Sequence, residues 1–246
     1  MEIVLIGAGN MGSAMLAGLK GYKLLVVDKN EKKLEALQRK YPHISFSRDI
    51  PNIEDKVVLL AIKPQGLEAI SLEGKAKALI SILAGVSLER LKKQIEAEFY
   101  IRAMPNVAAM YQKSITSVVG DSAFKKEAME ILSSIGKVVW LESEKELDIA
   151  TALGASSPAW LAMVAEALVD GAVNLGLRRD KALEYMPMLF EGVGAVLHEK
   201  HPALFKDMVS SPGGTTIAGI ASLEKDGVRS AFIEAMRECY KRAKEL

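Results

Sequence analysis

The feature that most constrains this chain is a glycine-rich segment, IGAGNMG at residues 6–12, whose first residue is the last residue of the apolar run EIVLI at residues 2–6. Gly7, Gly9 and Gly12 match the spacing of the turn between the first strand and the first helix of dinucleotide-binding folds. There the first glycine allows a tight bend, the second lets a pyrophosphate approach the backbone, and the third lets the helix pack on the strand. Because a helix N-terminus offers free amides and a positive dipole, we expect the pyrophosphate to bind there.

An acidic residue stands where such a turn needs one. Asp28 ends the next apolar run, about 20 residues after Gly9, where a carboxylate accepts hydrogen bonds from the ribose hydroxyls. A carboxylate also repels a 2′-phosphate, so Asp28 favours NADH over NADPH. Lys29, Asn30 and Arg48 are either phosphate ligands or solvated loop residues, so both cofactors stay open.

The first part of the chain alternates apolar runs with helical stretches. We expect strands at residues 2–6, 23–27, 56–62, 78–83, 99–104, 114–119 and 137–141. We expect helices near 10–20, 30–40, 87–97 and 122–135, with Ser87 capping the third and Asp121 or Ser122 the fourth. Most of the strands lack polar alternation, as in a parallel sheet covered on both faces. The sequence therefore predicts an α/β Rossmann-type domain at residues 1–145, whose segments AIKP (61–64) and LAG (83–85) lie at the ligand-binding edge of the sheet.

Strand signals stop after about residue 142, which predicts an all-α domain at residues 146–246. Its helices are expected near 144–153, 158–176, 180–199, 202–209, 214–225 and 228–245, with a kink at Pro187. The helix at 158–176 is apolar around most of its circumference, and a domain of this size can hardly enclose it alone. We therefore expect a second copy of the chain to cover it, giving a homodimer through the C-terminal helices.

Composition narrows the function classes. The chain has 32 basic and 31 acidic residues and a formal net charge of +1, which gives no general reason to bind nucleic acid or an anionic membrane. We see no apolar run of membrane-spanning length. A single cysteine, Cys239, and a glycine turn that begins at Gly7 favour a cytoplasmic protein. His198 and His201 lack the spacing of a zinc helix, so no metal site is expected.

A second glycine turn, SSPGGTT at residues 210–216, lies near the end of the chain. Its last six residues combine a proline, two glycines and three hydroxyl residues: Ser211, Pro212, Gly213, Gly214, Thr215 and Thr216. Such a segment at a helix start can form a nest of amide donors for a carboxylate or phosphate, or it can be a well-capped turn between two helices.

Five segments in this order give the chain a family resemblance: IGAGNMG, AIKP, RAMPN, TALGASSPAW and PALFKDMVSSPGGTTIAGIASLEKDGVRSAFIEA. Over essentially its whole length the chain resembles the pyrroline-5-carboxylate reductases. The resemblance implies that it makes L-proline from 1-pyrroline-5-carboxylate with NADPH or NADH, the last step of proline biosynthesis. It also implies a Rossmann domain, and a helical domain that interlocks with a second subunit, often within pentamers of dimers, that is, decamers.

The resemblance also assigns residues. The substrate carboxylate would lie in the second glycine turn, which contains Gly213, on Ser211 and on the amides of Gly214, Thr215 and Thr216. The Thr216 hydroxyl would bond to the ring nitrogen, which makes Thr216 the candidate catalytic residue. The expected cofactor-binding residues are Gly7, Ala8, Gly9, Asn10, Met11, Gly12, Asp28, Lys29, Ala61, Ile62, Lys63, Pro64 and Asn106.

Two segments depart from the pattern of many family members. Val107 and Ala108 stand where they have Thr-Pro, and residues 154–159 read GASSPA instead of SGSGPA. These departures keep other functions open: a reductase of another cyclic imine, an enzyme like the β-hydroxyacid dehydrogenases, or a nucleotide-sensing protein without activity. Those dehydrogenases would be expected to have a catalytic lysine in the helical domain, and the helix at 158–176 contains none.

Overall fold

The computed structural model describes residues 1–245, which form two compact units. The first unit comprises Met1–Ser156 and the end of the chain from Glu238 onward, and the second comprises Ser157–Arg237. The first unit extends beyond the expected domain of residues 1–145 because the helical turns that follow the last strand pack against the sheet. The end of the last helix also belongs to it, and there Cys239 Sγ lies 3.2 Å from Ser156 Oγ.

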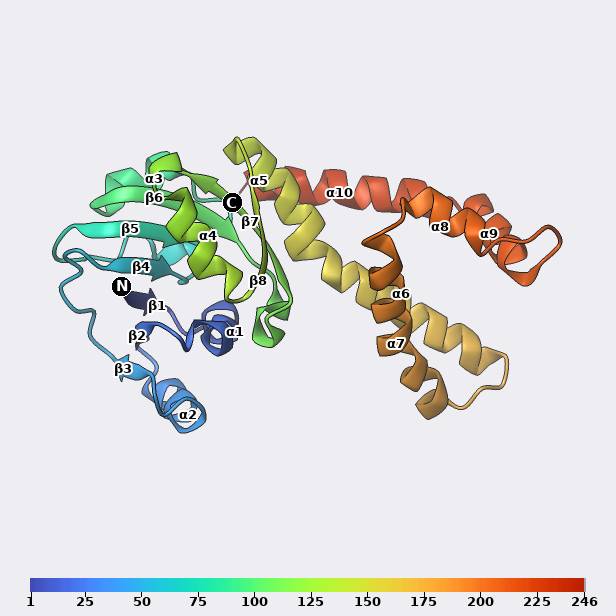
Figure 1. The fold of residues 1–246 in the computed structure, drawn as a ribbon, viewed down its shortest axis with the longest axis horizontal. Helices are drawn as coiled ribbons and strands as arrows, with labels where there is room; N and C mark the ends of the chain where they lie inside the picture. Colours follow the sequence, from blue (N-terminus) through green and yellow to red (C-terminus); the bar gives the residue numbers. More distant parts are fainter. Residues whose placement is uncertain (246) are drawn as a thin grey trace. The chain divides into compact units, whose positions relative to one another are not determined.

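An eight-stranded sheet forms the centre of the first unit, in the order β3-β2-β1-β4-β5-β6-β7-β8 (Figure 1). The strands are β1 (Glu2–Ile6), β2 (Lys23–Val27), β3 (Ser45–Ser47), β4 (Val57–Leu60), β5 (Ala76–Ser81), β6 (Ala97–Met104), β7 (Ser114–Gly120) and β8 (Gly136–Trp140). The predicted Rossmann-type fold is confirmed. The three-residue strand β3 has a polar sequence, SFS, and lies outside the seven ranges predicted as strands.

One pair of strands departs from the expected parallel sheet, because β6 and β7 run antiparallel. The link between them contains only a short 3₁₀ helix, Val107–Tyr111. A parallel connection needs a crossover of about a dozen residues or more. The chain therefore turns back directly, and β8 then pairs in parallel with β7.

Helices cover both faces of this sheet. They are α1 (Asn10–Leu19), α2 (Glu31–Lys40), α3 (Leu88–Gln94), α4 (Lys125–Ser133) and α5 (Glu144–Ala150). In β1, Ile3 and Leu5 belong to the core that contains α1 and α4, whereas Val4 and Ile6 belong to the core that contains α3. Since side chains alternate between two buried faces, the strand is apolar without interruption from Ile3 to Ile6.

The helix caps agree with expectation in one case and differ in another. Ser87 Oγ accepts a hydrogen bond from the Arg90 amide and caps α3, as predicted. Asp121 caps no helix, and its carboxylate instead accepts from the Tyr100 amide at 2.7 Å. Ser122 lies in a 3₁₀ turn before α4, so neither of the two expected residues caps that helix.

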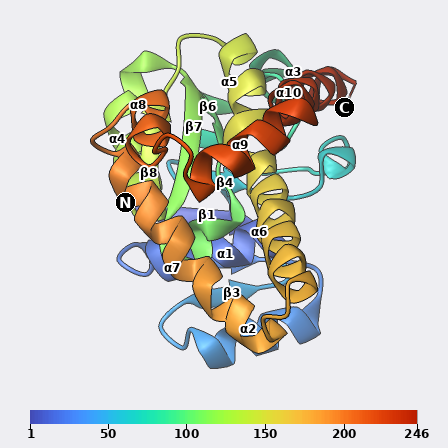
Figure 2. The same cartoon turned by 90° about the vertical axis from the view of Figure 1, so that its right-hand side faces the viewer.

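The second unit is entirely helical, as expected. A π-helical turn at the end of the first unit (Thr151–Ser156) leads into α6 (Ser157–Asn174). The helices that follow are α7 (Arg179–Leu197), α8 (Pro202–Met208), α9 (Thr215–Lys225) and α10 (Val228–Lys244). The end of α10 belongs to the first unit. Figure 2 shows α6 and α7 as two long helices joined by a short loop. Val169 is buried in α6 and Ala182 in α7, whereas many of their large apolar side chains are exposed.

The helical segment Glu144–Asn174 is long and apolar enough to cross a membrane by length and composition. Its mean hydropathy is 1.4 over 18 residues, 11% of which are buried. The sequence expectation concerned an uninterrupted apolar run, whereas this helix reaches the required mean hydropathy although charged residues such as Glu166 and Asp170 interrupt it. A core helix of a soluble protein has the same length and composition, so this helix does not indicate a membrane protein.

Candidate functional site

The first glycine turn has the geometry that its sequence predicts. Gly7 has a φ of +102°, and a Cβ added there would lie 2.6 Å from the carbonyl oxygen of Ala61. A Cβ on Gly12 would collide with the Gly7 carbonyl oxygen, so this glycine allows α1 to approach β1. A Cβ on Gly9 would meet no atom of the described chain within 4 Å. The turn therefore needs two of its glycines for packing, and the third faces open space that a ligand can fill.

This turn opens into a cavity of about 820 Å³ at the carboxyl ends of β1, β2, β4 and β5. Such a volume is typical of a site for a small ligand or cofactor. The expected residues that line it are Gly7, Gly9, Asn10, Met11, Asp28, Lys29, Ala61, Ile62, Lys63 and Pro64. Ala8 and Gly12 support the turn from outside this lining.

The cavity also includes residues that were not assigned to the site. Lys33 lies in the first turns of α2, and Ile82, Leu83 and Ala84 follow β5. Positions 83 and 84 could have been found from the sequence, because they lie in the LAG segment at the end of an expected strand. No sequence pattern marked Lys33, whose side chain comes near the cavity only because α2 follows β2 closely.

Asp28 organises one end of the cavity. Its Oδ2 accepts a hydrogen bond from the Ala8 amide at 2.8 Å, and its Oδ1 accepts from the Asn30 amide at 2.9 Å. Lys33 Nζ lies 3.4 Å from the same carboxylate. Burial alone raises the pKa of Asp28, but the two amide hydrogen bonds and Lys33 outweigh it, and the pKa is lower than its ordinary value. Asp28 is therefore ionised at neutral pH.

Three cationic side chains surround this carboxylate end. Lys29, Lys33 and Arg48 all line the cavity, and Arg48 Nη1 also lies 3.6 Å from Glu31 Oε2. Lys29 is exposed, and Arg48 pairs with Glu31 at the surface, so a ligand can displace that pair at small cost. The pair of Lys33 with Asp28 is partly buried. The same end of the cavity thus offers a hydrogen-bond acceptor for hydroxyls and positive charge for a phosphate.

Asn106 lies outside the cavity lining and is buried. Its Nδ2 donates to the carbonyl oxygen of Gly154 at 2.8 Å, and its Oδ1 accepts from the Ala108 amide at 3.0 Å. The side chain thus joins the turn after β6 to the π-helical turn. Its role toward the cofactor stays a prediction.

The second glycine turn leads into α9. Gly213 has a φ of +70°, which favours glycine, and a Cβ on Gly214 would collide with Ser211 Oγ. Gly214 precedes the first residue of α9, and none of the described side chains caps that helix. The hydroxyls of Ser211, Thr215 and Thr216 therefore do not cap α9, which differs from the alternative of a well-capped turn between two helices. The first amides of an uncapped helix of 11 residues suit an anion, because they carry the positive end of the helix dipole.

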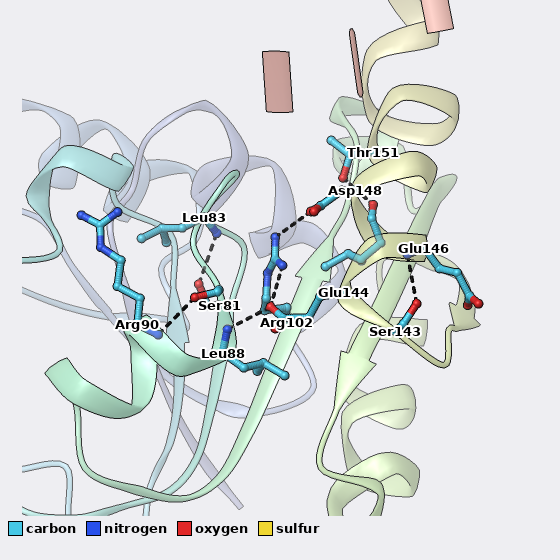
Figure 3. A network of polar contacts seen from close by, with 12 residues as sticks. Ser81, Leu83, Leu88, Arg90, Arg102, Ser143, Glu144, Glu146, Asp148 and Thr151 are labelled. Atoms are coloured by element: carbon cyan, nitrogen blue, oxygen red, sulfur yellow. Dashed lines mark hydrogen bonds and ion pairs between the residues drawn. The ribbon is translucent and has the colours of Figure 1, made fainter. Parts of the chain in front are cut away.

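An ion-pair network around the buried Arg102, with two partly exposed carboxylates, lies beside the cavity, at the carboxyl ends of β5 and β6 (Figure 3). Arg102 Nη1 lies 2.7 Å from Glu144 Oε1, and Arg102 Nη2 lies 3.2 Å from Asp148 Oδ1. Glu144 Oε1 also accepts from the Leu88 amide at 2.9 Å. Sequence analysis did not single out these residues, and within residues 1–245 no cluster of His, Cys, Asp and Glu could hold a metal ion.

Known proteins resemble the chain along its whole length. Residues 2–85 match the family described as NADP oxidoreductase coenzyme F420-dependent, and residues 144–246 match pyrroline-5-carboxylate reductase dimerisation. The pyrroline-5-carboxylate reductase of a Synechocystis strain is 39% identical, covering 100% of this chain and 98% of its own, and that of Helicobacter pylori strain J99 is 35% identical, covering 98% and 99%.

A solved structure agrees with these sequence relatives. The 1-pyrroline-5-carboxylate reductase of Streptococcus pyogenes superposes with a TM-score of 0.88 at 30% identity, covering 100% of this chain and 99% of the other. The matched region includes both the glycine turn of the cavity and the turn before α9. By fold, by cavity and by full-length similarity, this chain belongs to the pyrroline-5-carboxylate reductase family.

Proposed function

We propose that this protein reduces 1-pyrroline-5-carboxylate to L-proline, with hydride from a nicotinamide dinucleotide, in the last step of proline biosynthesis. The observation that carries the proposal is the pair of glycine turns. The first has open space over Gly9 within a large cavity, and the second precedes a helix that no described side chain caps. The two turns suit two different anionic groups, a pyrophosphate and a carboxylate.

A bound cofactor would supply hydride from the nicotinamide C4 to the imine carbon of the ring, which becomes the δ carbon of L-proline, and the ring nitrogen would gain or already carry a proton. The residues of the first turn, Gly7–Gly12, hold the pyrophosphate at the start of α1. Asp28 accepts from the adenosine ribose. The residues from Ala61 to Pro64 lie along the cofactor, and Asn106 is assigned to cofactor binding as well.

The second turn holds the substrate. The amides of Thr215 and Thr216 and the Ser211 hydroxyl donate to the carboxylate. The Gly214 amide, which the family resemblance also assigned to the carboxylate, instead donates to the Ser211 carbonyl oxygen at 3.0 Å and closes the turn, and Gly213 provides its left-handed backbone conformation. The Thr216 hydroxyl oxygen accepts from the protonated ring nitrogen. Since a threonine hydroxyl is a weak acid, it positions the iminium rather than protonating it. Reduction of an activated C=N bond needs little more than this positioning and the exclusion of water.

We further propose that the enzyme accepts both NADH and NADPH, with Asp28 favouring NADH. The carboxylate is held by two amides and partly neutralised by Lys33, which weakens its repulsion of a 2′-phosphate. Lys29 and Arg48 add positive charge on the same side. The cavity therefore lacks a strong barrier against either cofactor.

The active form is proposed to be a cytoplasmic homodimer through the C-terminal helices, with assembly into decamers as in related enzymes. Large apolar side chains in the second unit are exposed in the single chain, among them Leu175 (92%), Met188 (68%) and Met163 (66%). Such a surface is stable in water only when it is covered. The segment that matches a dimerisation family contains all of these residues, so a second copy is the proposed cover.

The deciding experiment measures oxidation of NADH and NADPH by the purified protein with 1-pyrroline-5-carboxylate. A 3-hydroxyacid with the oxidised cofactors and a six-membered cyclic imine serve as alternative substrates. We expect the five-membered ring to give the highest kcat/KM. Preference for another compound would reassign the substrate, and cofactor binding without any turnover would support a nucleotide-sensing protein.

A further inference from the structure

We propose that Glu144 is a positioning residue, which connects the buried Arg102 to the loop at the nicotinamide half of the cavity. This inference rests on the proposed function, because it concerns where the cofactor ring is held for hydride transfer. It is carried by one carboxylate at the start of α5 that contacts two other elements: β6 through Arg102, and the start of α3 through the Leu88 amide.

Arg102 provides a fixed point. Its side chain is 4% exposed, and its guanidinium contacts two carboxylates that lie one helical turn apart on α5. A buried cation without a partner is strongly unfavourable, so this arginine holds its partners firmly. In the sheet, Arg102 pairs with Ser81, the last residue of β5. Arg102 therefore lies beside the point where the chain leaves the sheet for the loop 82–88.

The loop 82–88 is fastened at both ends. At its start the Leu83 amide donates to Ser81 Oγ at 3.3 Å, and at its end the Leu88 amide donates to Glu144 Oε1 at 2.9 Å (Figure 3). Between these two points Ile82, Leu83 and Ala84 line the cavity. Glu144 thus holds one end of a cavity wall without touching the cavity itself.

The position of this wall in the sheet identifies the part of the cofactor that it faces. The glycine turn follows β1 and Asp28 follows β2, which places the adenosine on the β1–β2 side. The loop 82–88 follows β5, on the other side of β1 beyond β4. A dinucleotide that crosses the sheet at the glycine turn therefore has its nicotinamide on the side of this loop. A displacement of about 1 Å in a positioning element can lower a rate about 100-fold.

Asp148 provides a matched control on the same helix. It also pairs with Arg102, but of the two carboxylates only Glu144 bonds to the loop among the described residues. Removing either one leaves Arg102 with a single partner, so the effects on stability should be similar. Only the loss of Glu144 releases the Leu88 amide. A difference between the two variants therefore measures loop positioning rather than general destabilisation.

The experiment compares Glu144→Ala, Glu144→Gln and Asp148→Ala in the full-length protein. For each variant we would measure thermal unfolding, kcat and KM for 1-pyrroline-5-carboxylate, and Kd for NADH and for ADP-ribose, which lacks the nicotinamide. We expect Glu144→Ala to lower kcat at least ten-fold more than Asp148→Ala does. We expect it also to weaken NADH binding while the Kd for ADP-ribose stays within about two-fold of wild type. Glu144→Gln should recover part of kcat, since its amide oxygen can still accept from Leu88.

Equal losses of kcat in Glu144→Ala and Asp148→Ala would overturn the inference, as would equal weakening of ADP-ribose and NADH binding. If Glu144→Ala does not fold, Glu144→Ser, whose side chain is too short to accept from the Leu88 amide, is compared with Asp148→Ala by the same NADH and ADP-ribose measurements. These two Kd values need no turnover. A wild-type protein that fails to reduce the imine would therefore refute the proposed function and still leave the role of Glu144 tested.

Discussion

Replacing Asp28 with serine tests the adenosine end of the cavity most directly. The carboxylate accepts from the amides of Ala8 and Asn30 at 2.8 and 2.9 Å, and its side chain is 15% exposed. A hydrogen bond to a charged group contributes about 1.5–3 kcal/mol. The shorter serine hydroxyl can replace at most one of the two. We therefore expect the free energy of unfolding to fall by about 1.5–3 kcal/mol, with less than about 1 kcal/mol from the partly exposed Lys33 pair.

The effect on the two cofactors differs in sign. NADH loses the carboxylate that accepts from its ribose hydroxyls, which should lower kcat/KM for NADH about 10- to 100-fold, or roughly 1.4–2.7 kcal/mol. NADPH gains from the removal of a negative charge near its 2′-phosphate, and Lys33 is released to contact that phosphate. The ratio of kcat/KM for NADPH to that for NADH should therefore rise at least about ten-fold.

The assay is the initial rate of imine reduction with each cofactor, in wild type and in Asp28→Ser, after unfolding curves show that both are folded. Lys33→Met is the control with the opposite sign, since it removes the positive charge and keeps the carboxylate. A ratio that does not change in Asp28→Ser would refute the reasoning. A strong preference of the wild type for NADPH would also contradict the proposed role of Asp28.

Three further predictions concern the two turns and the carboxylate. Thr216→Ala should lower kcat/KM for the imine by about 1–3 kcal/mol, while the Kd for the cofactor stays nearly constant. Gly214→Val should lower kcat/KM further, because a Cβ there collides with Ser211 Oγ. Weaker NADH binding with unchanged imine kinetics would exclude this turn as the substrate site. Gly9→Val should abolish cofactor binding in calorimetry, because the added side chain would fill the space expected to hold the pyrophosphate. The Tm should change little, since the φ of −66° at Gly9 is allowed for valine and a Cβ there would meet open space. Retained cofactor binding would contradict the pyrophosphate site. Because the pKa of Asp28 is lowered in the folded state, its carboxylate stabilises the fold at pH values above the ordinary aspartate pKa, and this contribution is lost as the pH falls through the folded-state pKa. The difference in free energy of unfolding between wild type and Asp28→Asn should therefore be constant near neutral pH and shrink in acid. A difference that does not depend on pH would contradict this assignment.

Local patterns in the sequence were sufficient to predict most of the elements. An uninterrupted apolar run forms a strand such as β1 because both faces of the sheet are covered, and this requirement acts on every residue of the run. The turn was predictable because the backbone conformation at Gly7 and the packing at Gly12 restrict these two positions to glycine over a short distance. The cap by Ser87 was predictable for the same reason, since its partner is only three residues away.

Tertiary structure alone decided the contacts between residues far apart in the chain. Glu144 meets Leu88 across 56 positions and Arg102 across 42, and Asn106 meets Gly154 across 48. The same holds for Asp121, which looks like a helix cap in the sequence but bonds to the Tyr100 amide, because β6 turns back into β7 and brings that amide within reach. The amide, carboxylate and guanidinium groups of such residues can be satisfied by many partners, and a sequence pattern does not select among them. Only the packing of the strands and helices determines which of these groups meet, because a buried polar group must bond to whatever partner the fold places beside it.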